Sequence, residues 1–322
     1  MEFINKTKNQ HFISQVEQKL NASVNNPRKI YSFTLGDREE YKLNLDCPKG
    51  VSIENNLSLN DLFSFDVIRS NPERYNFEGL FGKYEKLIKN NTESLLKKIK
   101  KNDSDIKNEI LNIFVLKMVN FARNPFSIQK VLNTFPSLLT MYPLDSKFEK
   151  IFDKVLSGKK PHQQYLCNEL GITEDIYRDW LTIIFMLLTP FDSSGINILE
   201  HSVKSLCESK DNMIFINIYT YDEQCCLLSD RGFSNPIPDC EHMAWSFNLF
   251  AKGFIQYMFA DWRSFIPENT PNKYIEGIKR QNKKLNVCTH HNDYEQLEIY
   301  NKNVVYQCYK KVYCSSSAIY GL

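Results

Sequence analysis

The stretch FEGLFGKYEKLIKNNTESLLKKIKK, residues 77–101, decides the fold class of the central part of the chain. Its apolar residues recur at intervals of three and four, the spacing that places side chains on one face of an α-helix. Those residues are Phe77, Leu80, Phe81, Tyr84, Leu87, Ile88, Leu95, Leu96 and Ile99. The basic end KKIKK suits a helix C-terminus, because cations are stabilised near the negative end of the helix dipole. The stretch therefore predicts a long amphipathic helix.

Further helices are expected on the C-terminal side of this stretch. A cap at Asp103 precedes an apolar stripe that begins at Ile106, and the sequence RNP that begins at Arg123 is typical of a helix end. Residues 71–209 are therefore predicted to form an α-helical block. The later segments with helical spacing are 145–157, 161–170, 173–188 and 195–209.

Both ends of the chain contain stretches in which side chains alternate with a period of two, which is typical of strands. On the N-terminal side, after a short helix in QHFISQVEQKLNA, these stretches are RKIYSFTLG (28–36) and EYKLNLDCPKG (40–50). On the C-terminal side, MIFINIYT (213–220) and CCLLSD (225–230) are predicted to form a hairpin across YDEQ. The stretches WSFNLF and GFIQYMF are expected to add strands.

Two closing helices are expected at about 271–285 and 293–312, and no internal repeat or Gly/Ser-rich linker divides the chain. We therefore predict an α+β fold, a mainly α-helical block with a small, mostly antiparallel sheet from the N-terminal and C-terminal segments. The chain is expected to form a single domain. Its parts are a strand-rich segment at 1–65, the helical block at 71–209, and the hairpin with the closing helices at 213–322.

The composition indicates a globular protein without a strong charge bias. Hydrophobic residues make up 42% of the 322 residues, which excludes general disorder, and Lys plus Arg (40) nearly balance Asp plus Glu (38). The start MEFINKTKNQ has no apolar run typical of a signal peptide. The most apolar stretch, WLTIIFMLLTPF (180–191), is shorter than the ~20 residues that span a bilayer and is expected to be a buried helix. We therefore expect a cytoplasmic protein without membrane association.

The nine cysteines are expected to be reduced thiols, because their number is odd, their spacing is irregular and no export signal is present. A zinc site would have to combine Cys240-x-His242 with Cys288-x-His290-His291. Zinc ligand pairs are usually two to four residues apart, whereas these pairs skip only one. We therefore predict neither a zinc site at these residues nor a disulfide.

Short polar motifs occur at five places along the chain. These are the opening Gln10-His11-Phe12-Ile13, a helix with Glu78 and Glu85, the sequence FARNPF with Arg123 and Pro125, the sequence LLSDRGF with Ser229 and Asp230, and the last helix LEIYNKNVVYQCYKKVYCSS with Asn301 and Val312.

In order and spacing, these motifs resemble the large bacterial family catalogued as domain of unknown function four-two-three-eight, over nearly the whole chain. Members of that family open with Gln-His-aromatic-aliphatic-Pro and carry Arg-x-Pro in a central helix. They have Thr-Ser-Asp-x-Pro after a late strand and close on a helix that contains an Asn. This sequence has Ser14 and Gly232 in place of the two prolines. The resemblance implies a bacterial phage-defence or toxin context, and the family has no established reaction.

The residue types at these motifs suit phosphodiester chemistry, and we predict a catalytic set of His11, Glu85, Arg123 and Asp230. A histidine moves protons near neutral pH, a carboxylate orients it or holds a divalent metal, and an arginine stabilises a phosphate. The chain lacks a P-loop and a nucleophile elbow. The leading hypothesis is an RNase-like effector that acts on nucleic acid, on RNA in preference to DNA, with a divalent metal left open as cofactor. The expected substrate-binding residues are Gln10, Ser229 and Asn301.

Each predicted catalytic residue also has a structural interpretation. His11 can anchor the first helix, Glu85 can be a surface residue, Arg123 can bond helix-end carbonyls, and Asp230 can cap a turn. The alternative function is therefore a non-catalytic sensor or partner-binding protein of a defence system, which responds to a protein or a phage-derived trigger. Proximity separates the two hypotheses, and the first one predicts that His11 packs beside Ser229 and Asp230.

Overall fold

The chain divides into two compact units, each assembled from three segments. Unit 1 consists of Met1–Val16, Glu54–Asn90 and Ile113–Ser202, and unit 2 consists of Glu17–Ile53, Asn91–Asn112 and Val203–Leu322. The predicted single-domain organisation stays a prediction. The computed structural model describes residues 3–68, 73–160, 162–191, 195–209, 212–223, 225–237, 243–261, 263, 266–267, 269–281 and 285–322.

Unit 1 contains most of the central helices and two short antiparallel strand pairs. The strand pairs are β1 (Asn9–His11) with β5 (Ser58–Asn60), and β6 (Ser64–Val67) with β7 (Arg74–Asn76). Its helices are α4 (Ile128–Thr134), α5 (Ser146–Ser157), α6 (Gln163–Leu170) and α7 (Glu174–Leu188), with 3-10 turns η2 (Pro125–Ser127) and η3 (Pro136–Thr140). The helices α1 (Gln15–Leu20), α2 (Glu78–Lys100), α3 (Lys107–Arg123) and α8 (Ile198–Glu208) each contribute residues to both units.

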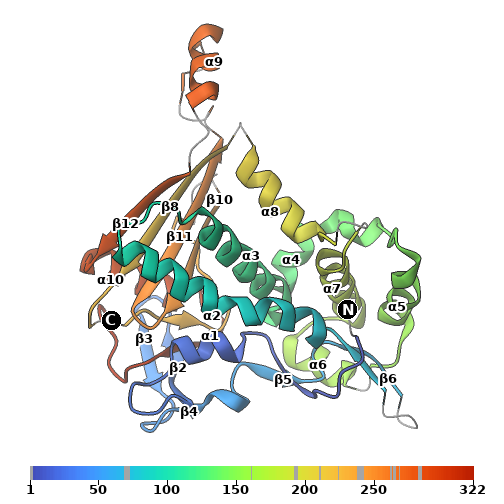
Figure 1. Cartoon of the computed structure of the whole chain (residues 1–322). Helices are drawn as coiled ribbons and strands as arrows, with labels where there is room; N and C mark the ends of the chain where they lie inside the picture. Colours follow the sequence, from blue (N-terminus) through green and yellow to red (C-terminus); the bar gives the residue numbers. More distant parts are fainter. Residues whose placement is uncertain are drawn as a thin grey trace. The chain divides into compact units, whose positions relative to one another are not determined.

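Helix α7 is the buried helix of unit 1, with α4, α5 and α6 around it (Figure 1). The Thr173 side chain caps its first turn by accepting the N–H of Ile176, and every residue from Trp180 to Leu188 is buried. The predicted buried helix is therefore present. In the described part of the chain, no helix is both long and apolar enough to cross a membrane. The phenylalanines that pack with one another around Phe185 are Phe3, Phe77, Phe148 and Phe152.

Two sheets form the framework of unit 2. The first has the order β10-β11-β8-β12 and is antiparallel except for the parallel β12–β8 pair. Its strands are β10 (Met243–Phe250), β11 (Gly253–Asp261), β8 (Asn212–Thr220) and β12 (Asn286–His291). The second has the order β3-β2-β13-β9, with β4 paired to β2. Its strands are β3 (Lys42–Leu45), β2 (Lys29–Asp37), β13 (Lys311–Cys314), β9 (Leu228–Ser229) and β4 (Val51–Ser52), and η1 (Ile53–Asn55) follows β4.

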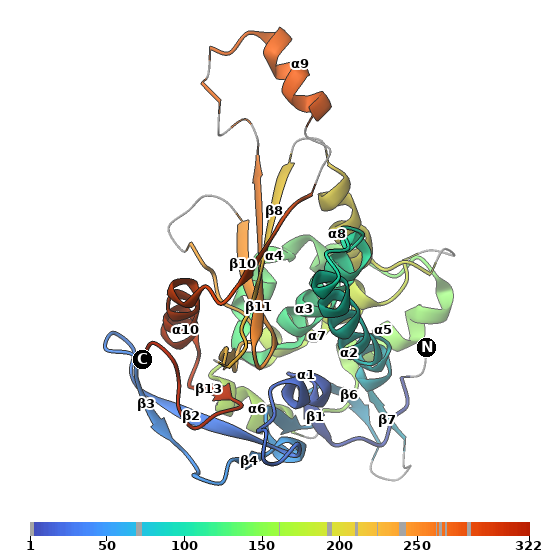
Figure 2. The same cartoon turned by 60° about the vertical axis from the view of Figure 1, so that its left-hand side comes forward.

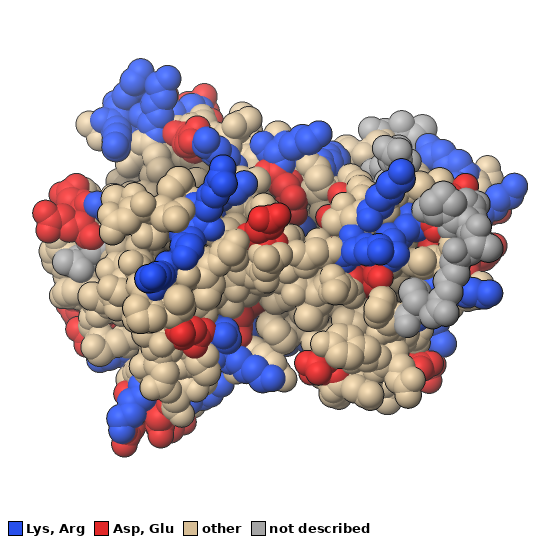
Figure 3. Space-filling view, turned by 90° about the horizontal axis from the view of Figure 1, so that it is seen from below, with Lys and Arg blue, Asp and Glu red and all other residues tan. Residues whose placement is uncertain are grey.

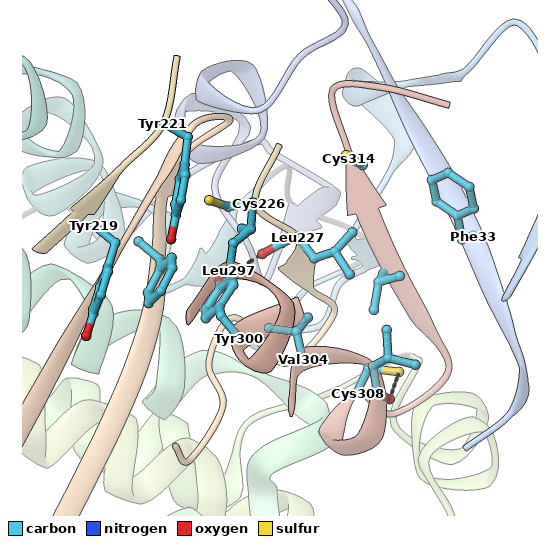
Figure 4. Packing of buried hydrophobic residues seen from close by; sticks show 13 residues of the cluster. Phe33, Tyr219, Tyr221, Cys226, Leu227, Leu297, Tyr300, Val304, Cys308 and Cys314 are labelled. Atoms are coloured by element: carbon cyan, nitrogen blue, oxygen red, sulfur yellow. Dashed lines mark hydrogen bonds between the residues drawn. The ribbon is translucent and has the colours of Figure 1, made fainter. Parts of the chain in front are cut away.

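The antiparallel pairing of β2 with β13 joins the N-terminal and C-terminal segments in one sheet, as the sequence predicted. The fold is α+β, with helices and small, mostly antiparallel sheets. Helix α10 (Tyr294–Gln307) packs on the strands through side chains that include Leu297, Tyr300 and Val304 (Figure 4). The Tyr300 ring stacks on Phe254 with centroids 4.0 Å apart. The Tyr300 hydroxyl donates to the carbonyl of Leu227 at 2.8 Å. Helix α9 (Asn272–Gln281) lies beyond the ends of β8 and β11 (Figures 1 and 2).

Two predictions for the C-terminal part are wrong. The predicted hairpin of 213–220 with 225–230 does not form, because β8 pairs with β11 and β12 while β9 pairs with β13. The hairpin in this region is β10–β11. The last helix ends at Gln307 rather than at residue 312, because residues 311–314 form β13. Strand β12 and helix α4 were not predicted.

Candidate functional site

The structure brings Glu85 and Arg123 together in unit 1. Arg123 ends α3 with 1% of its side chain exposed, whereas Glu85 on α2 is 31% exposed. The Nη1 of Arg123 donates to Glu85 Oε1 at 2.7 Å. Its Nε and Nη2 both donate to Asn120 Oδ1, at 3.2 and 2.8 Å. The pair thus has a buried cation and a carboxylate that reaches solvent.

Aromatic packing holds this end of α3 in place. The guanidinium of Arg123 lies 4.9 Å from the centre of the Phe81 ring. The centroids of the Phe81 and Phe63 rings are 4.8 Å apart. The indole of Trp180 donates to the carbonyl of Ala122 at 2.8 Å, next to Arg123. Excluding water around the guanidinium strengthens its interactions with nearby anions.

Glu78, the first residue of α2, is the most perturbed carboxyl of this site. Burial raises the pKa of Glu78 to about 7, the negative charge of Glu85 also raises it, and Arg123 opposes both. The Oε1 atom of Glu78 is buried and has no hydrogen-bond partner among the residues that the structure describes. A carboxyl group with a pKa near neutrality can both accept and donate a proton under cellular conditions.

Glu78 was not among the predicted site residues. The available signal was its spacing from Glu85, since residues seven apart lie on the same face of a helix. The cation that faces both carboxylates comes from another helix, and the sequence does not show that proximity. We call Glu78, Glu85, Asn120 and Arg123 the carboxylate–arginine cluster.

Gln10 holds the opening strand in place and is completely buried. Its Nε2 donates to Ser64 Oγ at 3.1 Å and to the carbonyl of Thr7 at 3.2 Å. Its Oε1 accepts the N–H of Phe63 at 2.5 Å. These bonds join β1 to β6, so the structure gives Gln10 an architectural role.

His11 ends β1 and is paired with Ser58 of β5. The next residue, Phe12, packs edge-on against Phe126 with ring centroids 5.3 Å apart. Phe126 belongs to the FARNPF motif, which also contains Arg123. The opening motif and the FARNPF motif lie in the same unit, and the rings of Phe12 and Phe126 are in contact.

Asp230 and Ser229 lie in unit 2, where they organise the backbone. Asp230 is 2% exposed, and its carboxylate accepts the backbone N–H groups of Tyr309, Lys310 and Lys311 at 2.8, 2.7 and 2.8 Å. Burial raises the pKa of Asp230, and these three hydrogen bonds oppose the rise. The hydroxyl of Ser229 accepts the N–H of Arg231 at 3.1 Å.

Asn301 of α10 is also completely buried. Its Oδ1 accepts the N–H of Leu227 at 3.1 Å, and its Nδ2 donates to the carbonyls of Tyr320 at 3.0 Å and Cys225 at 3.4 Å. Asn301 therefore ties α10 to the segment before β9 and to the C-terminal segment. His11 belongs to unit 1 and Asp230 to unit 2, so the predicted packing of one beside the other stays a prediction.

Metal-ligating side chains do not gather in the described part of the chain, where no group of three His, Cys, Asp or Glu could hold an ion. Two members of the zinc alternative, Cys240 and His242, lie outside the described residues. The others lie on or beside β12, where the His290 ring stacks on Tyr219 at 4.5 Å. The eight described cysteines are unpaired in the structure, and their reduced state stays a prediction.

The surface adds two observations about partners. On the face shown in Figure 3, Lys and Arg side chains lie among Asp and Glu side chains, with wide uncharged areas between them. Unit 1 has a pocket of about 280 Å³ with a mainly apolar lining that includes the exposed side chains of Met141, Tyr142 and Leu144. Apolar pockets of this kind bind small molecules or apolar side chains of partners.

The sequence and the structure of this chain were compared with those of known proteins. No family model matches the chain, and neither a curated protein nor a solved structure matches it. The resemblance to the domain family stays a prediction that rests on the five motifs.

Proposed function

We propose that the protein is a bacterial defence effector that cleaves RNA phosphodiester bonds at the carboxylate–arginine cluster. The observation that carries the proposal is the placement of a buried guanidinium beside Glu78, whose pKa is about 7. A proton-transfer group titrating near neutral pH beside a fixed cation is the combination that phosphoryl transfer needs.

In the proposed reaction, the carboxylate of Glu78 takes the proton of a ribose 2′-hydroxyl. The 2′-oxygen attacks the adjacent phosphorus, and the bond to the 5′-oxygen of the next nucleotide breaks. Arg123 stabilises the charge that develops on the phosphoryl oxygens, Glu85 holds Arg123, and His11 protonates the leaving oxygen. The products are a 2′,3′-cyclic phosphate and a 5′-hydroxyl, so DNA, which lacks the 2′-hydroxyl, is not a substrate.

The direct test is incubation of the purified protein with single-stranded RNA and DNA of the same sequence, with and without Mg²⁺ or Mn²⁺. We expect cleavage of the RNA alone, with cyclic phosphate ends. Glu169→Gln, an exposed position of α6 in the same unit, is the matched control and should retain full activity. RNA that stays intact under all these conditions would falsify the proposal.

His11→Ala is expected to abolish RNA degradation and toxicity in bacteria that express the protein. If His11 is a proton-transfer group that contributes few packing contacts, the substitution should also change the free energy of unfolding by no more than about 0.5 kcal/mol. Thermal melting of the purified variant beside the toxicity assay checks both. If the variant melts several degrees lower and loses activity only in proportion to the loss of folded protein, the role of His11 is structural.

The second candidate function is a non-catalytic sensor or partner-binding protein, and one observation favours it. Gln10, Ser229, Asp230 and Asn301 are buried and hydrogen-bonded to backbone or neighbouring groups, as an architectural role requires. The two functions differ in what a cluster variant does. Loss of the biological effect in Glu78→Gln, with RNA intact in cells expressing the wild type, would support partner binding.

A further inference from the structure

Cys225 and Cys314 of unit 2 form a pair of interacting thiols. Cys314 ends β13 and belongs to the buried cluster against which Cys225 packs, and the two thiol groups interact. On the other side, the hydroxyl of Ser315 lies 2.9 Å from the Cys225 sulfur. Figure 4 shows Cys314 at the end of its strand, with Cys226 in the neighbouring core.

The two sulfurs have different access to solvent. Cys225 is partly exposed, whereas Cys314 and Cys226 are completely buried. A small oxidant in solution can therefore reach Cys225, and Cys314 can react only through Cys225. In this arrangement Cys225 is oxidised first, and Cys314 reacts afterwards with the oxidised Cys225.

The polarity around the pair favours charge on Cys225. The hydrogen bond from Cys314, a second one from Ser315 and the charge of Lys252 lower the pKa of the Cys225 thiol below its ordinary value, although burial opposes them. The pKa of Cys314 is raised, by the interaction with Cys225 and by burial, and burial raises that of Cys226. The reactive thiolate is thus on the sulfur that solvent reaches.

The backbone around the pair is held in place on both sides. The carbonyl of Cys225 accepts from Asn301 Nδ2, and the N–H of Cys226 donates to the carbonyl of Ala251 at 2.7 Å. On the partner side, β13 pairs with β2 and β9. The contact between the sulfurs therefore follows from the fold.

We infer that Cys225 and Cys314 are a redox-active dithiol site that reduces hydroperoxides, a site independent of the proposed RNA cleavage. The Cys225 thiolate attacks one oxygen of the peroxide and the O–O bond breaks. The other oxygen leaves and takes a proton, as water or an alcohol, and the sulfur becomes a sulfenic acid. The Cys314 sulfur then attacks it, the S–S bond forms and the S–O bond breaks. The leaving hydroxide takes the Cys314 proton and becomes water.

The test treats the purified, reduced full chain with equimolar hydrogen peroxide, followed by alkylation of the remaining thiols and peptide mass spectrometry. We expect the wild type to lose two alkylatable thiols, to contain a 225–314 disulfide and to recover both with dithiothreitol. Cys314→Ser should instead hold a sulfenic acid on Cys225 that dimedone traps. Cys288→Ser, which removes an exposed thiol of β12, is the matched control and should behave as wild type.

A second measurement does not depend on whether Cys314→Ser folds. In the wild type, the rate of Cys225 alkylation by iodoacetamide should rise to its plateau at a pH below the ordinary titration range of thiols, because the thiolate already exists there. Oxidation of Cys225 no faster than Cys288, or a Cys225 alkylation rate that rises only in the ordinary thiol range, would overturn the inference.

Discussion

Glu78→Gln is expected to lower the rate of RNA cleavage by about 10²- to 10⁴-fold, the usual contribution of a general acid or base. Glutamine has nearly the size and shape of glutamate, but it cannot take up the 2′-hydroxyl proton. The rate of the wild type should rise with pH through about 7, where Glu78 ionises. This rise should be absent from the residual activity of the variant. The check is a pH–rate profile of both proteins on the same RNA.

The same substitution is expected to stabilise the protein at high pH. The native pKa of Glu78 is about 7, against an ordinary value of 4.5, so the native state holds this proton more tightly than the unfolded chain does. The stability contributed by the protonated form is fully present below pH 4.5 and is lost as pH rises to 7. Above pH 7 the buried carboxylate costs up to roughly 3–4 kcal/mol, from a pKa difference of 2.5 at about 1.4 kcal/mol per unit.

Urea unfolding of wild type, Glu78→Gln and the control Glu169→Gln at pH 4, 6 and 8 measures this effect. The stability advantage of Glu78→Gln over wild type should grow from pH 4 to pH 8, and the control should show no such trend. An advantage that stays constant across this range would mean that Glu78 titrates as an ordinary exposed carboxyl. Glu78 would then not be a proton-transfer group that titrates near neutral pH.

Asp230→Ala is expected to destabilise the protein by about 3 kcal/mol or more, because it leaves three partly buried backbone N–H donors without their acceptor. Those donors, at Tyr309, Lys310 and Lys311, form the turn between α10 and β13. Asp230→Asn keeps one acceptor oxygen and should lose less. Denaturant unfolding at neutral pH measures both variants.

The control for this experiment is Asp222→Ala in the same unit. The Asp222 carboxylate is 66% exposed, so its loss should destabilise the protein far less than the loss of the buried Asp230 carboxylate. If Asp230→Ala unfolds like the control and is inactive on RNA, Asp230 acts in catalysis and its architectural assignment is wrong.

The local sequence pattern was sufficient to predict the helices and strands whose apolar side chains recur at the regular spacing of the element. The period of three and four in α2, α3 and α7 predicted these helices, because each presents a continuous apolar stripe to the core. The alternation in β2 and β3 predicted their antiparallel pairing in the same way. The residue types of the cluster, Glu85 and Arg123, were also identified from sequence, since charged groups at a helix end and in a motif can be recognised locally.

Tertiary structure alone decided the features that depend on a distant partner. Strand β13 interrupts an apparently helical pattern because β2, almost 280 residues earlier, supplies the hydrogen bonds. Asp230 is an anchor because three N–H groups about 80 residues later converge on it. The pKa of Glu78 depends on burial and on Arg123 from another helix. Burial and the proximity of charges depend on how distant segments of the chain pack together, so they cannot be read from the local pattern of a single sequence.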